Sequence, residues 1–540
     1  MDSSFNKLRG GYYTPKEITR FIAEWAIRNS DDKVLEPSCG DGHFLEAARN
    51  TYVAKGAKES DIYKNLLGVE LYSNEAQKAR NTGAKVIDGD FFSYYKENIK
   101  GKEIFRAVIG NPPFIRYQNF DEVYRKCAFE LVSEVGINLN RLSNIWLPFL
   151  ILSTECLKKQ GGRLGMVIPA ELFQVDYAAD VRQYLSDKYE HLIIITFKKL
   201  LWNDAQQEVV LLLGERSSDK KGIELFELED CDSLQNFSYE TSQGEVKKLD
   251  HSSEKWTKYY LDSKELELMR ILENSNDLVQ TTELFDVNVG VVSGQNKFFV
   301  LDEETVKKNG LEDSVTPIIG RAEQLKGIRL KIDDIEELRK SQKKVYMFSP
   351  KNEEYSELTK NEKKYIKWGE TQKYNLGYKC RIRKWWYIIP QTWMPDAFML
   401  RQINRVPKIV LNETDATNTD TLHKIRFLNG VNGQNVTAAM LNSFTFAQCE
   451  ITGRSYGGGV MTFEPGEVRK LKIPMKNSEK LDIDYIDELM RKKDIYTVLN
   501  YTDKVLLMEG MGLSDKQVQL LRGIWEKLSE RRINRKLTTC

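Results

Sequence analysis

The sequence predicts an α/β protein whose first half contains a mostly parallel β-sheet and whose second half is a separate mixed α+β domain. In the first half, short apolar strand segments alternate with helical patterns, and residues 34–45 join a strand to a helix through a turn with Gly40 and Gly42. A strand, a small-residue turn and a helix form the first half of a nucleotide-binding βαβ unit. At 540 residues the chain exceeds what one hydrophobic core usually supports. We therefore expect a Rossmann-like domain followed by a second domain.

Composition narrows the class of protein. Lys and Arg (80) nearly balance Asp and Glu (79), so a basic surface would have to be local. The seven cysteines form no CxxC pair and have no histidine at ligand spacing, which argues against a disulfide framework and against a metal site. No apolar run approaches the ~18 residues of a membrane span, and the N-terminus lacks a signal-peptide pattern. We expect a cytoplasmic protein that works as a monomer.

The first expected element is a helix that follows two tyrosines, at positions 12 and 13. Thr14 has the character of an N-cap residue, Pro15 suits the first helical position, and Glu17 would complete a capping box. This pattern explains the segment as structure alone. The same helix N-terminus, with two tyrosines before it, could also hold a carboxylate.

Three successive strands are expected to end in a carboxylate. Glu36 closes the strand before the glycine turn, Glu70 closes the next strand, and Asp90 follows the third, beside Phe91. The carboxyl ends of parallel strands share one edge of a sheet, so these side chains should converge on one crevice. An acidic crevice disfavours a pyrophosphate and suits a cationic ligand. The alternative is that each carboxylate is a solvated loop charge.

The fourth strand, at residues 105–109, runs into an Asn-Pro-Pro-Phe loop. Two consecutive prolines fix two φ angles and remove two N–H donors. The loop would therefore present the Asn111 side-chain oxygen and the Pro112 carbonyl as acceptors beside the ring of Phe114. A planar group that carries an NH2, such as adenine, would satisfy both acceptors and stack on the ring. By itself, however, Asn-Pro-Pro can also simply end a strand.

Taken in order, these motifs resemble those of a known family. They are Tyr-x-Thr-Pro at 12–15, Val-Leu-Glu-Pro-Ser-Cys-Gly-Asp-Gly at 34–42, Gly-Val-Glu at 68–70, Gly-Asp-Phe at 89–91 and Gly-Asn-Pro-Pro-Phe at 110–114. The ordered set resembles the gamma class of N6-adenine DNA methyltransferases of type II restriction-modification systems. The match continues through residues 161–170 and covers residues 12 to about 215. The resemblance implies a site-specific enzyme that flips adenine out of double-stranded DNA and methylates N6 from S-adenosylmethionine. It also implies a cognate restriction endonuclease encoded separately.

The resemblance further implies roles for individual residues. The S-adenosylmethionine site would comprise Thr14, Glu36, Ser38, Gly40, Glu70, Asp90, Phe91, Asn111, Pro113 and Phe149. Glu70 would hold the ribose, and Asp90 with Phe91 would hold the adenine ring. The catalytic loop would comprise Asn111, Pro112, Pro113 and Phe114. Phe114 stands where the family's commonest motif has Tyr, which keeps the stacking face and loses the hydroxyl.

After residue 169 the pattern predicts a helix at 177–185, strands at 192–197 and 208–213, and a loop at 198–205 between the strands. Such a hairpin suggests the antiparallel edge common in these sheets. In similar enzymes an aromatic residue of this loop covers the second face of the extruded base. Trp202 is the first candidate and Phe197 the second, and the alternative is a tryptophan packed beneath the loop.

Polar residues at 216–260 suggest a boundary between a catalytic domain at 1–245 and a DNA target-recognition domain at 246–480, which a helical segment at 481–540 follows. Residues 361–410 contain eleven Lys and Arg against three Asp and Glu, interleaved with aromatic residues. Arg381, Arg383 and Lys384 lie at the centre of this basic segment, and we expect them to contact DNA. The alternative is an aromatic core with solvated lysines. Residues 289–297, 419–423 and 455–460 also resemble landmarks of target-recognition domains.

Two other functions stay open on the sequence. A protein-glutamine methyltransferase would offer the same two amide hydrogens to the loop at 111–114, but it would not need a large basic and aromatic second domain. A non-catalytic DNA-binding module with a degenerate nucleotide fold is the other, and the intact set of carboxylates and loop residues argues against it. A nuclease fused upstream would have no room, because the motifs begin at residue 12.

Overall fold

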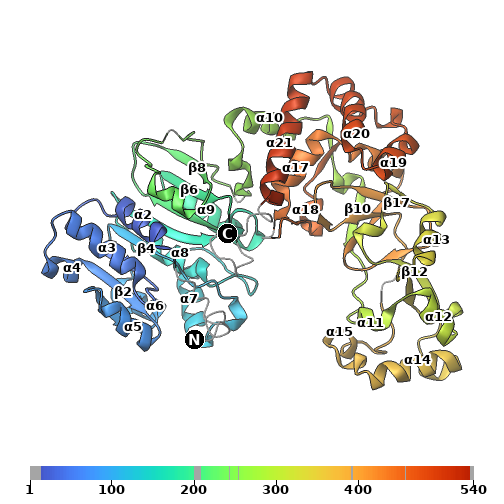
Figure 1. Cartoon of the computed structure of the whole chain (residues 1–540), viewed down its shortest axis with the longest axis horizontal. Coiled ribbons are helices and arrows are strands. Elements are labelled where there is room, and N and C mark those ends of the chain that lie inside the picture. The colour runs from blue at the N-terminus through green and yellow to red at the C-terminus, as the bar shows by residue number, and fades with distance from the viewer. Residues whose placement is uncertain are drawn as a thin grey trace. The chain divides into compact units, whose positions relative to one another are not determined.

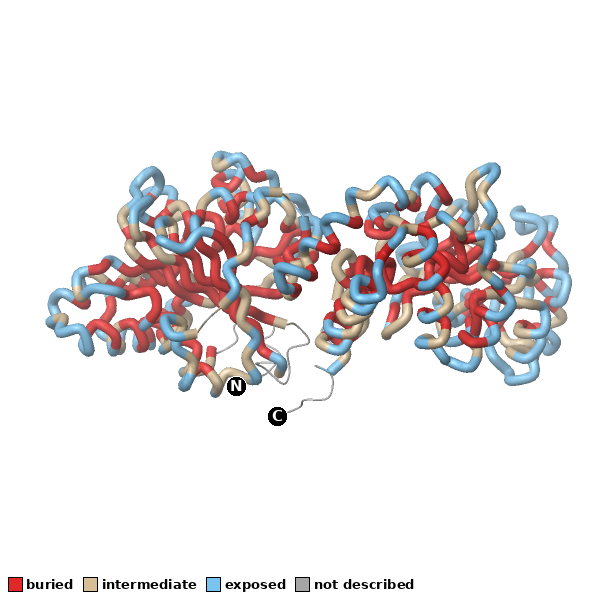
Figure 2. Tube along the Cα trace, turned by 90° about the horizontal axis from the view of Figure 1, so that it is seen from above, coloured by how far each residue is buried: buried red, intermediate tan, exposed pale blue. Residues whose placement is uncertain are grey.

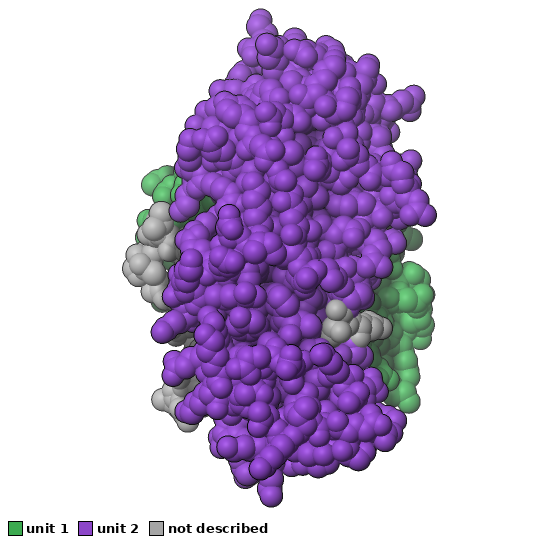
Figure 3. Space-filling view, turned by 90° about the vertical axis from the view of Figure 1, so that its right-hand side faces the viewer, with its two compact units in different colours: residues 1–263, 456–458, 533–540 green, residues 264–455, 459–532 purple. Residues whose placement is uncertain are grey.

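The computed structural model describes residues 14–199, 208–242, 244–252, 254–390, 393–455 and 458–534 (Figure 1). The chain divides into two compact units, which Figure 3 distinguishes by colour. The first comprises Met1–Ser263 with Tyr456–Gly458 and Ile533–Cys540, and the second comprises Lys264–Ser455 with Gly459–Arg532. The 3-10 helix Trp256–Tyr260 packs its Trp256 and Tyr259 into the core of the first unit. The first unit therefore extends past residue 245, where the composition places the boundary.

An eight-stranded sheet forms the centre of the first unit, in the order β3-β2-β1-β4-β5-β7-β6-β8. The strands are β1 (Val34–Glu36), β2 (Leu66–Glu70), β3 (Lys85–Asp88), β4 (Ala107–Gly110), β5 (Arg163–Pro169), β6 (His191–Phe197), β7 (Val209–Glu215) and β8 (Gly222–Leu228). The first five are parallel, and β7 is antiparallel to both of its neighbours. The mostly parallel sheet with an antiparallel hairpin is thus confirmed. Outside the hairpin, β8 pairs in parallel with β6 and forms the edge.

Helices cover both faces of this sheet. They are α2 (Lys16–Ala26), α3 (His43–Ala54), α4 (Glu59–Asn65), α5 (Ser73–Arg80), α6 (Phe91–Tyr94), α7 (Glu122–Glu134), α8 (Trp146–Glu155) and α9 (Ala179–Lys188). Successive strand residues point to opposite faces, so Val34 packs with α2 to α5 and Leu35 packs with α6 to α9. Burial on both faces explains the near-continuous apolar strands, which appear as the block of buried chain in the first unit in Figure 2.

The start of α2 differs from the sequence prediction. The helix begins at Lys16, its N-cap is Pro15 in an extended conformation, and no side chain caps it. The predicted N-cap role of Thr14 is therefore wrong. Its hydroxyl instead accepts a hydrogen bond from Asn111 Nδ2 at 3.2 Å. A tertiary partner has replaced the local capping bond, and the two tyrosines at 12 and 13 lie outside the described residues.

The second unit is mixed α+β, as predicted, with sheets in the orders β10-β19-β15-β17-β13, β11-β14-β12-β18, β16-β21-β20 and β22-β9. Its strands are β9 (Leu278–Gln280), β10 (Phe285–Val289), β11 (Val300–Leu301), β12 (Val315–Ile319), β13 (Arg329–Leu330), β14 (Tyr346–Phe348), β15 (Ala397–Leu400), β16 (Gln402–Ile403), β17 (Ile409–Asn412), β18 (Thr417–Asn418), β19 (Leu422–Phe427), β20 (Arg454–Ser455), β21 (Met461–Thr462) and β22 (Lys472–Pro474).

The helices of the second unit are α10 (Ser263–Glu273), α11 (Asn296–Phe299), α12 (Glu303–Asn309), α13 (Ile332–Lys340), α14 (Lys360–Thr371), α15 (Tyr378–Arg381), α16 (Gly433–Ala439), α17 (Ser443–Thr452), α18 (Pro465–Val468), α19 (Ile483–Arg491), α20 (Ile495–Thr502) and α21 (Asp515–Asn534). Two hydrophobic clusters hold this unit together, a large one around β15, β17 and β19 and a smaller one around β11, β14 and α14. Of the described helices, none is long and apolar enough to cross a membrane.

Candidate functional site

A pocket opens where β1, β2 and β4 end. Its lining includes Glu36 and Glu70, the last residues of β1 and β2, and Asn111, which directly follows β4. Every residue that the sequence assigns to a cofactor lines this pocket: Thr14, Glu36, Ser38, Gly40, Glu70, Asp90, Phe91, Asn111, Pro113 and Phe149. Segments between residues 14 and 149 therefore meet in one place, because the carboxyl ends of parallel strands share one edge of the sheet.

The glycine turn after β1 fixes one of the carboxylates. Gly40 adopts a φ of +54° and Gly42 a φ of +99°, a region that side chains disfavour. With the chain turned in this way, Gly40 N donates to Glu70 Oε2 at 2.8 Å, and Tyr72 N donates to Glu70 Oε1 at 3.0 Å. A Cβ added at Gly40 would meet nothing within 4 Å. The turn thus orients the Glu70 carboxylate and leaves open space beside it.

Glu36 gives the pocket its electrostatic character. Its side chain is fully buried, and burial together with the charges of Glu70 and Asp41 raises its pKa well above the ordinary value. Within the described part of the chain, Glu36 Oε2 and Ser38 Oγ are buried and have no hydrogen-bond partner. Buried polar atoms without partners are costly, and buried charges call for a counter-charge. These atoms therefore suit a ligand with a positively charged, hydrogen-bonding end.

A second part of the pocket combines one carboxylate with aromatic rings. Asp90 caps α6 by accepting from Ser93 N at 2.7 Å, and burial raises the pKa of its carboxyl. Phe91 stacks on Phe149 with ring centroids 5.4 Å apart and planes 16° apart. Phe92 lies against the same ring at 4.7 Å. Flat apolar surfaces beside a hydrogen-bond acceptor fit a planar heterocycle that carries an amino group.

The loop after β4 places its acceptors at the same pocket. Gly110 has a φ of +153°, and a Cβ there would lie 3.5 Å from Glu36 Cγ. Asn111 Nδ2 donates to Thr14 Oγ1 at 3.2 Å, which directs the amide oxygen away from Thr14. Asn111 and Pro113 line the pocket, whereas Pro112 is buried and Phe114 is half-buried at the end of the loop.

Comparison with known proteins assigns the chain to a family. The family model described as N-6 DNA Methylase matches residues 3–280, more than half of the chain. The chain belongs to this family. A second model, the C-terminal domain of the type II methyltransferase M.Eco57I, matches residues 253–507. The two matches overlap at residues 253–280, and they cover the pocket-bearing unit and most of the second unit respectively.

Relatives of this N-6 DNA methylase family member include type II methyltransferases. M.AccI of Acinetobacter calcoaceticus is 24% identical over 92% of this chain and 92% of that protein. M.XamI of Xanthomonas campestris pv. amaranthicola is 23% identical over 86% of this chain and 85% of that protein. The predicted restriction-modification DNA methyltransferase is thereby confirmed.

Solved structures with a similar fold include restriction-modification enzymes. The type IIL enzyme MmeI in complex with DNA aligns over 96% of this chain and 75% of its own, with a TM-score of 0.56 and 12% identity. The DrdV–DNA complex aligns over 83% of this chain, with a TM-score of 0.53 and 12% identity, and this chain spans only 55% of that one. At 12% identity these similarities show that the chain shares the fold of the two enzymes.

Of the two predicted candidates for the second stacking wall, the structure describes only Phe197. Trp202 lies outside the described residues. Phe197 is the last residue of β6 and is only 3% exposed, because it packs in the core on the α2 face of the sheet. Phe91 and Phe149 are buried to a similar degree but line the pocket, whereas Phe197 is not among the residues that line it.

The pocket also contains residues that the sequence analysis did not select: Pro37, Cys39, Asp41, His43, Phe44, Leu71, Tyr72, Glu75, Gly89, Ile115 and Phe120. Asp41 and His43 belong to the glycine turn, and Tyr72 follows Glu70 closely, so nearness to a selected residue would have found them. Phe120 carried no such signal. It reaches the pocket from the segment before α7 and packs edge-on against Phe92.

The basic segment of the second unit divides into exposed and structural residues. Arg381 and Lys384 are exposed. Arg383 is partly buried: its Nη2 donates to Val292 O at 2.8 Å, its guanidinium lies over the Phe299 ring, and burial lowers its pKa. Of the three predicted DNA-contact residues, Arg381 and Lys384 are thus exposed to solvent, whereas Arg383 is partly buried.

The aromatic residues interleaved with this segment divide in the same way. Tyr365 and Trp386 pack on Phe298, with ring centroids 4.8 and 4.6 Å apart. Trp368 and Tyr378 are exposed by 42% and 66%. Part of the segment is therefore an aromatic core, and part remains available at the surface.

Two of the three landmark segments lie side by side in the second unit. Val291 N donates to Asn418 O at 2.8 Å, and Asp420 N donates to Val291 O at 3.1 Å. Arg401, which directly precedes β16, donates from Nη1 to Asp420 O at 3.1 Å. In the third landmark, Tyr456 and Gly457 lie outside the described residues.

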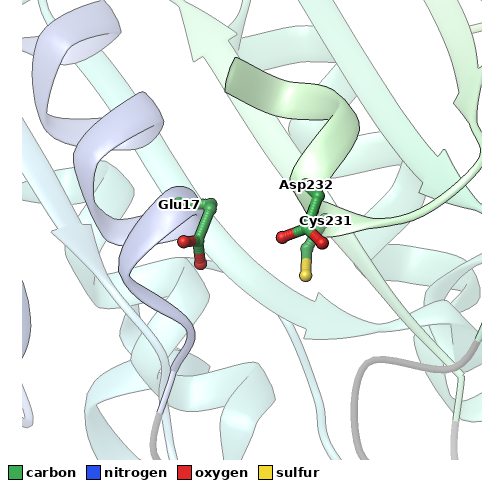
Figure 4. Close-up of side chains that lie close together, drawn as sticks. All are labelled: Glu17, Cys231 and Asp232. Carbon is green, nitrogen blue, oxygen red and sulfur yellow. The ribbon is translucent and has the colours of Figure 1, made fainter. Parts of the chain in front are cut away.

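One cluster elsewhere in the first unit has side chains that could share a cation. Ligand atoms of Glu17, Cys231 and Asp232 lie within 4.8 Å of one another, and Figure 4 shows Glu17 on α2 facing the start of the 3-10 helix Cys231–Gln235, which carries the other two. None of the three lines the pocket described above. Two carboxylates and one thiol, partly open to solvent, are an ordinary surface group, and we assign the cluster no role.

Proposed function

We propose that this DNA methyltransferase transfers the methyl group of S-adenosylmethionine to N6 of adenine in double-stranded DNA, after the base has been flipped into the site. The observation that carries the proposal is the meeting of an acidic, partly aromatic pocket with the loop 111–114 at the end of β4. One side suits a cationic nucleoside and the other suits a planar amine. Methyl transfer needs these two partners in contact.

The residues present fit S-adenosylmethionine, which methyltransferases of this family use. When bound, this cofactor supplies an electrophilic methyl group on a positively charged sulfur. Glu36 and Ser38 offer buried atoms without partners to its charged amino-acid end. Glu70, held by two backbone N–H groups, suits the ribose hydroxyls. Phe91, stacked on Phe149, and Asp90 suit the adenine ring and its amino group.

The loop 111–114 would act on the target amine. The N6 lone pair of adenine is conjugated with the ring and is a poor nucleophile. The Asn111 side-chain oxygen and the Pro112 carbonyl would accept the two amine hydrogens and favour a pyramidal nitrogen, which frees the lone pair for attack. Thr14 would hold the Asn111 amide in the required orientation through its hydrogen bond. Positioning and electrostatics would supply the rate.

Base flipping follows from where N6 lies in duplex DNA. This atom is paired inside the helix, so the base must leave its stack to reach the loop. Phe114 would carry one face of the extruded adenine and Trp202 the other. Arg381 and Lys384 would contribute phosphate contacts from the second unit. We further propose that the enzyme works as a monomer and that a separately encoded endonuclease shares its recognition site.

Product analysis tests the proposal. Purified protein is incubated with S-adenosylmethionine and genomic DNA that lacks modified bases, and the nucleosides are analysed by mass spectrometry. We expect N6-methyladenine, and long-read sequencing of the same DNA then identifies the recognition site. The Asn111→Ala protein provides the matched control. Methylcytosine in the DNA, or methylglutamine in a protein substrate with unmodified DNA, would overturn the proposal.

A further inference from the structure

An exposed apolar side chain lies on a rigid turn of the first unit. Residues 140–143 form a β-turn in which Ser143 N donates to Asn140 O at 3.0 Å. Asn140 Oδ1 accepts from Leu142 N at 2.8 Å, and Ser143 Oγ accepts from Asn140 N at 3.2 Å. Side-chain bonds of this type hold an Asx turn in shape. Arg141 and Leu142 therefore stand at the tip of a preformed turn, which we call the 140–143 turn.

The 140–143 turn is fastened to the segment that follows Phe114. Asn144 pairs with Arg116 in an antiparallel bridge, and Ile145 N donates to Ile115 O at 2.9 Å. Ile115 also lines the pocket, and Ile145 is fully buried in the core. An isolated antiparallel bridge thus joins the segment directly after the catalytic loop to the turn. The turn is consequently tied to a segment of which one residue, Ile115, lines the pocket.

Leu142 is 81% exposed, more than any other large hydrophobic side chain in the described part of the chain. A single exposed leucine is ordinary by itself, so the residues around it decide whether it marks a binding site. Arg141 at the same tip and Arg116 in the bridge are both exposed, and neither has a carboxylate partner among the described residues. An apolar tip with an exposed cation beside it in the sequence and another in the adjoining bridge suits a partner that is anionic outside and apolar inside, and duplex DNA has both properties.

Flipping a base leaves a gap in the stack and an unpaired partner base. Proteins that distort DNA fill such gaps with apolar wedges, leucine among them. We propose that Leu142 enters the duplex where the target adenine has left its stack, while Arg141 and Arg116 contact the flanking phosphates. This inference rests on the proposed base flipping and names the group that stabilises the flipped state.

The test compares two DNA substrates that carry the recognition site. One is a matched duplex, and in the other an abasic nucleotide lies opposite the target adenine, so that flipping breaks no base pair. We expect Leu142→Ala and Leu142→Gln in the full-length protein to lower kcat/KM on the matched duplex by about tenfold and to leave the abasic duplex within about twofold of wild type. Equal losses on both substrates, or no loss on the matched duplex, would overturn the wedge role.

A matched control uses an exposed apolar residue away from the pocket. Val53 is 49% exposed near the end of α3, whose first residue, His43, lines the pocket. Ten residues of helix place Val53 about 15 Å along the axis. Val53→Ala should leave both substrates unaffected. Because Leu142 is exposed, its variants should melt like wild type, so lost activity cannot be ascribed to unfolding.

Failure of the wedge and failure of base flipping give different results. With 2-aminopurine in place of the target adenine, wild-type protein should produce a strong rise in fluorescence, which Leu142→Ala should reduce on the matched duplex. No rise with wild type would refute flipping itself. A wild-type rise that is unchanged in Leu142→Ala refutes only the wedge. Arg141→Ala should instead weaken DNA binding on both duplexes and lower the salt slope by about one.

Discussion

Among single residues, Glu36 is placed where its charged form destabilises the fold but suits a cationic ligand. Its carboxyl is fully buried beside Glu70 and Asp41, and its pKa is raised well above the ordinary value. The folded protein therefore holds this proton more tightly than the unfolded chain does, where the pKa is about 4.3. Stability falls as the pH rises above that value, because the folded state must either keep the proton or bury a charge. A cationic ligand would remove this penalty.

We predict that Glu36→Gln raises the melting temperature of the ligand-free protein at pH 7. The expected gain is about 2–4 °C for each kcal/mol recovered. The difference from wild type should shrink as the pH falls and disappear below about pH 4.3, where both unfolded chains are neutral at this position. Thermal melts between pH 4 and pH 8 measure it. Identical melting temperatures throughout that range would show that burial of the Glu36 carboxyl does not lower the stability of the fold.

Asn111 should matter for turnover much more than for cofactor affinity. Removing an oriented hydrogen-bonding group from a reacting centre typically lowers turnover roughly 100- to 1,000-fold. Asn111→Ala should lose activity on that scale, while the Kd for S-adenosylmethionine rises by about tenfold at most, as for one lost hydrogen bond. Tritium transfer to DNA and calorimetry measure the two effects. Asn111→Asp keeps an acceptor oxygen and should retain part of the activity; near-wild-type turnover in Asn111→Ala would remove the residue from the proposed role.

Phe114 should contribute through stacking. Stacking of a base on an aromatic ring is worth ~1–3 kcal/mol, so Phe114→Ala should lower turnover by roughly one to two powers of ten. Phe114→Tyr keeps the ring and should stay close to wild type.

Trp202→Ala should act like Phe114→Ala if Trp202 forms the second wall. Phe197→Ala should mainly cost stability, by about 3–5 kcal/mol, because its ring is buried in the core. Stable but slow Phe197→Ala would contradict this assignment.

At the scale of elements, the basic segment shows how one stretch can serve both packing and binding. Arg383 is held against Val292 and Phe299, whereas Arg381 and Lys384 point to solvent from α15 and the residues after it. A cation that is already hydrogen-bonded within the protein has less to gain from a phosphate. The segment therefore offers fewer cations to DNA than its count of Lys and Arg suggests.

We predict different outcomes for these cations. Each phosphate contact contributes about 0.9 to the slope of log affinity against log salt, so Arg381→Ala combined with Lys384→Ala should lower that slope by about two. Arg383→Ala should chiefly reduce thermal stability, because a carbonyl partner and a ring contact are lost. Fluorescence anisotropy across salt concentrations and thermal melts provide the two readouts. Lys340→Ala, an exposed lysine at the end of α13, serves as the control. An unchanged slope in the double variant would place α15 off the DNA.

At the scale of the whole molecule, the second unit is held together by contacts between distant parts of the chain. Arg532 near the end of α21 donates to both carboxylate oxygens of Glu450 on α17, at 2.6 and 3.1 Å. Its Nη1 donates to Gly459 O at 2.6 Å. All of these groups are buried, and burial raises the pKa of Glu450 while Arg532 opposes the rise. The C-terminal helix is therefore part of the fold.

Breaking this buried pair should destabilise the second unit. Arg532→Ala would leave the Glu450 carboxyl buried without its partner, and we expect a loss of about 3–5 kcal/mol. Urea unfolding followed by intrinsic fluorescence measures the loss. Replacing both partners, Arg532→Met with Glu450→Leu, should recover most of it, because no unpaired charge remains. Should the single and double variants be equally unstable, packing of α21 and not the ion pair would be the source of the effect.

Local patterns at the ends of successive strands were enough to predict the parts of the site that those strand ends carry. The sequence alone places the strand-end carboxylates, the glycine turn and the loop 111–114 together, since parallel strands bring their carboxyl ends to one edge. Hydrophobic periodicity likewise predicted the mostly parallel sheet and its antiparallel hairpin. In each case the determining interactions are backbone geometry and the burial pattern of a few consecutive residues.

Only the tertiary structure decided which partner each polar or aromatic side chain takes. Thr14 looked like a helix cap but bonds to Asn111, and Tyr365 and Trp386 looked like candidates for DNA but pack on Phe298. The 140–143 turn carried no motif, and its nearness to the catalytic loop comes from the Arg116–Asn144 bridge. These choices depend on contacts between residues far apart in the chain, and periodicity and propensity carry no information about such contacts. The strand-end carboxylates and the loop 111–114 were therefore predictable from the sequence, whereas Phe120 and the groups that border the pocket were settled by the packing of the fold.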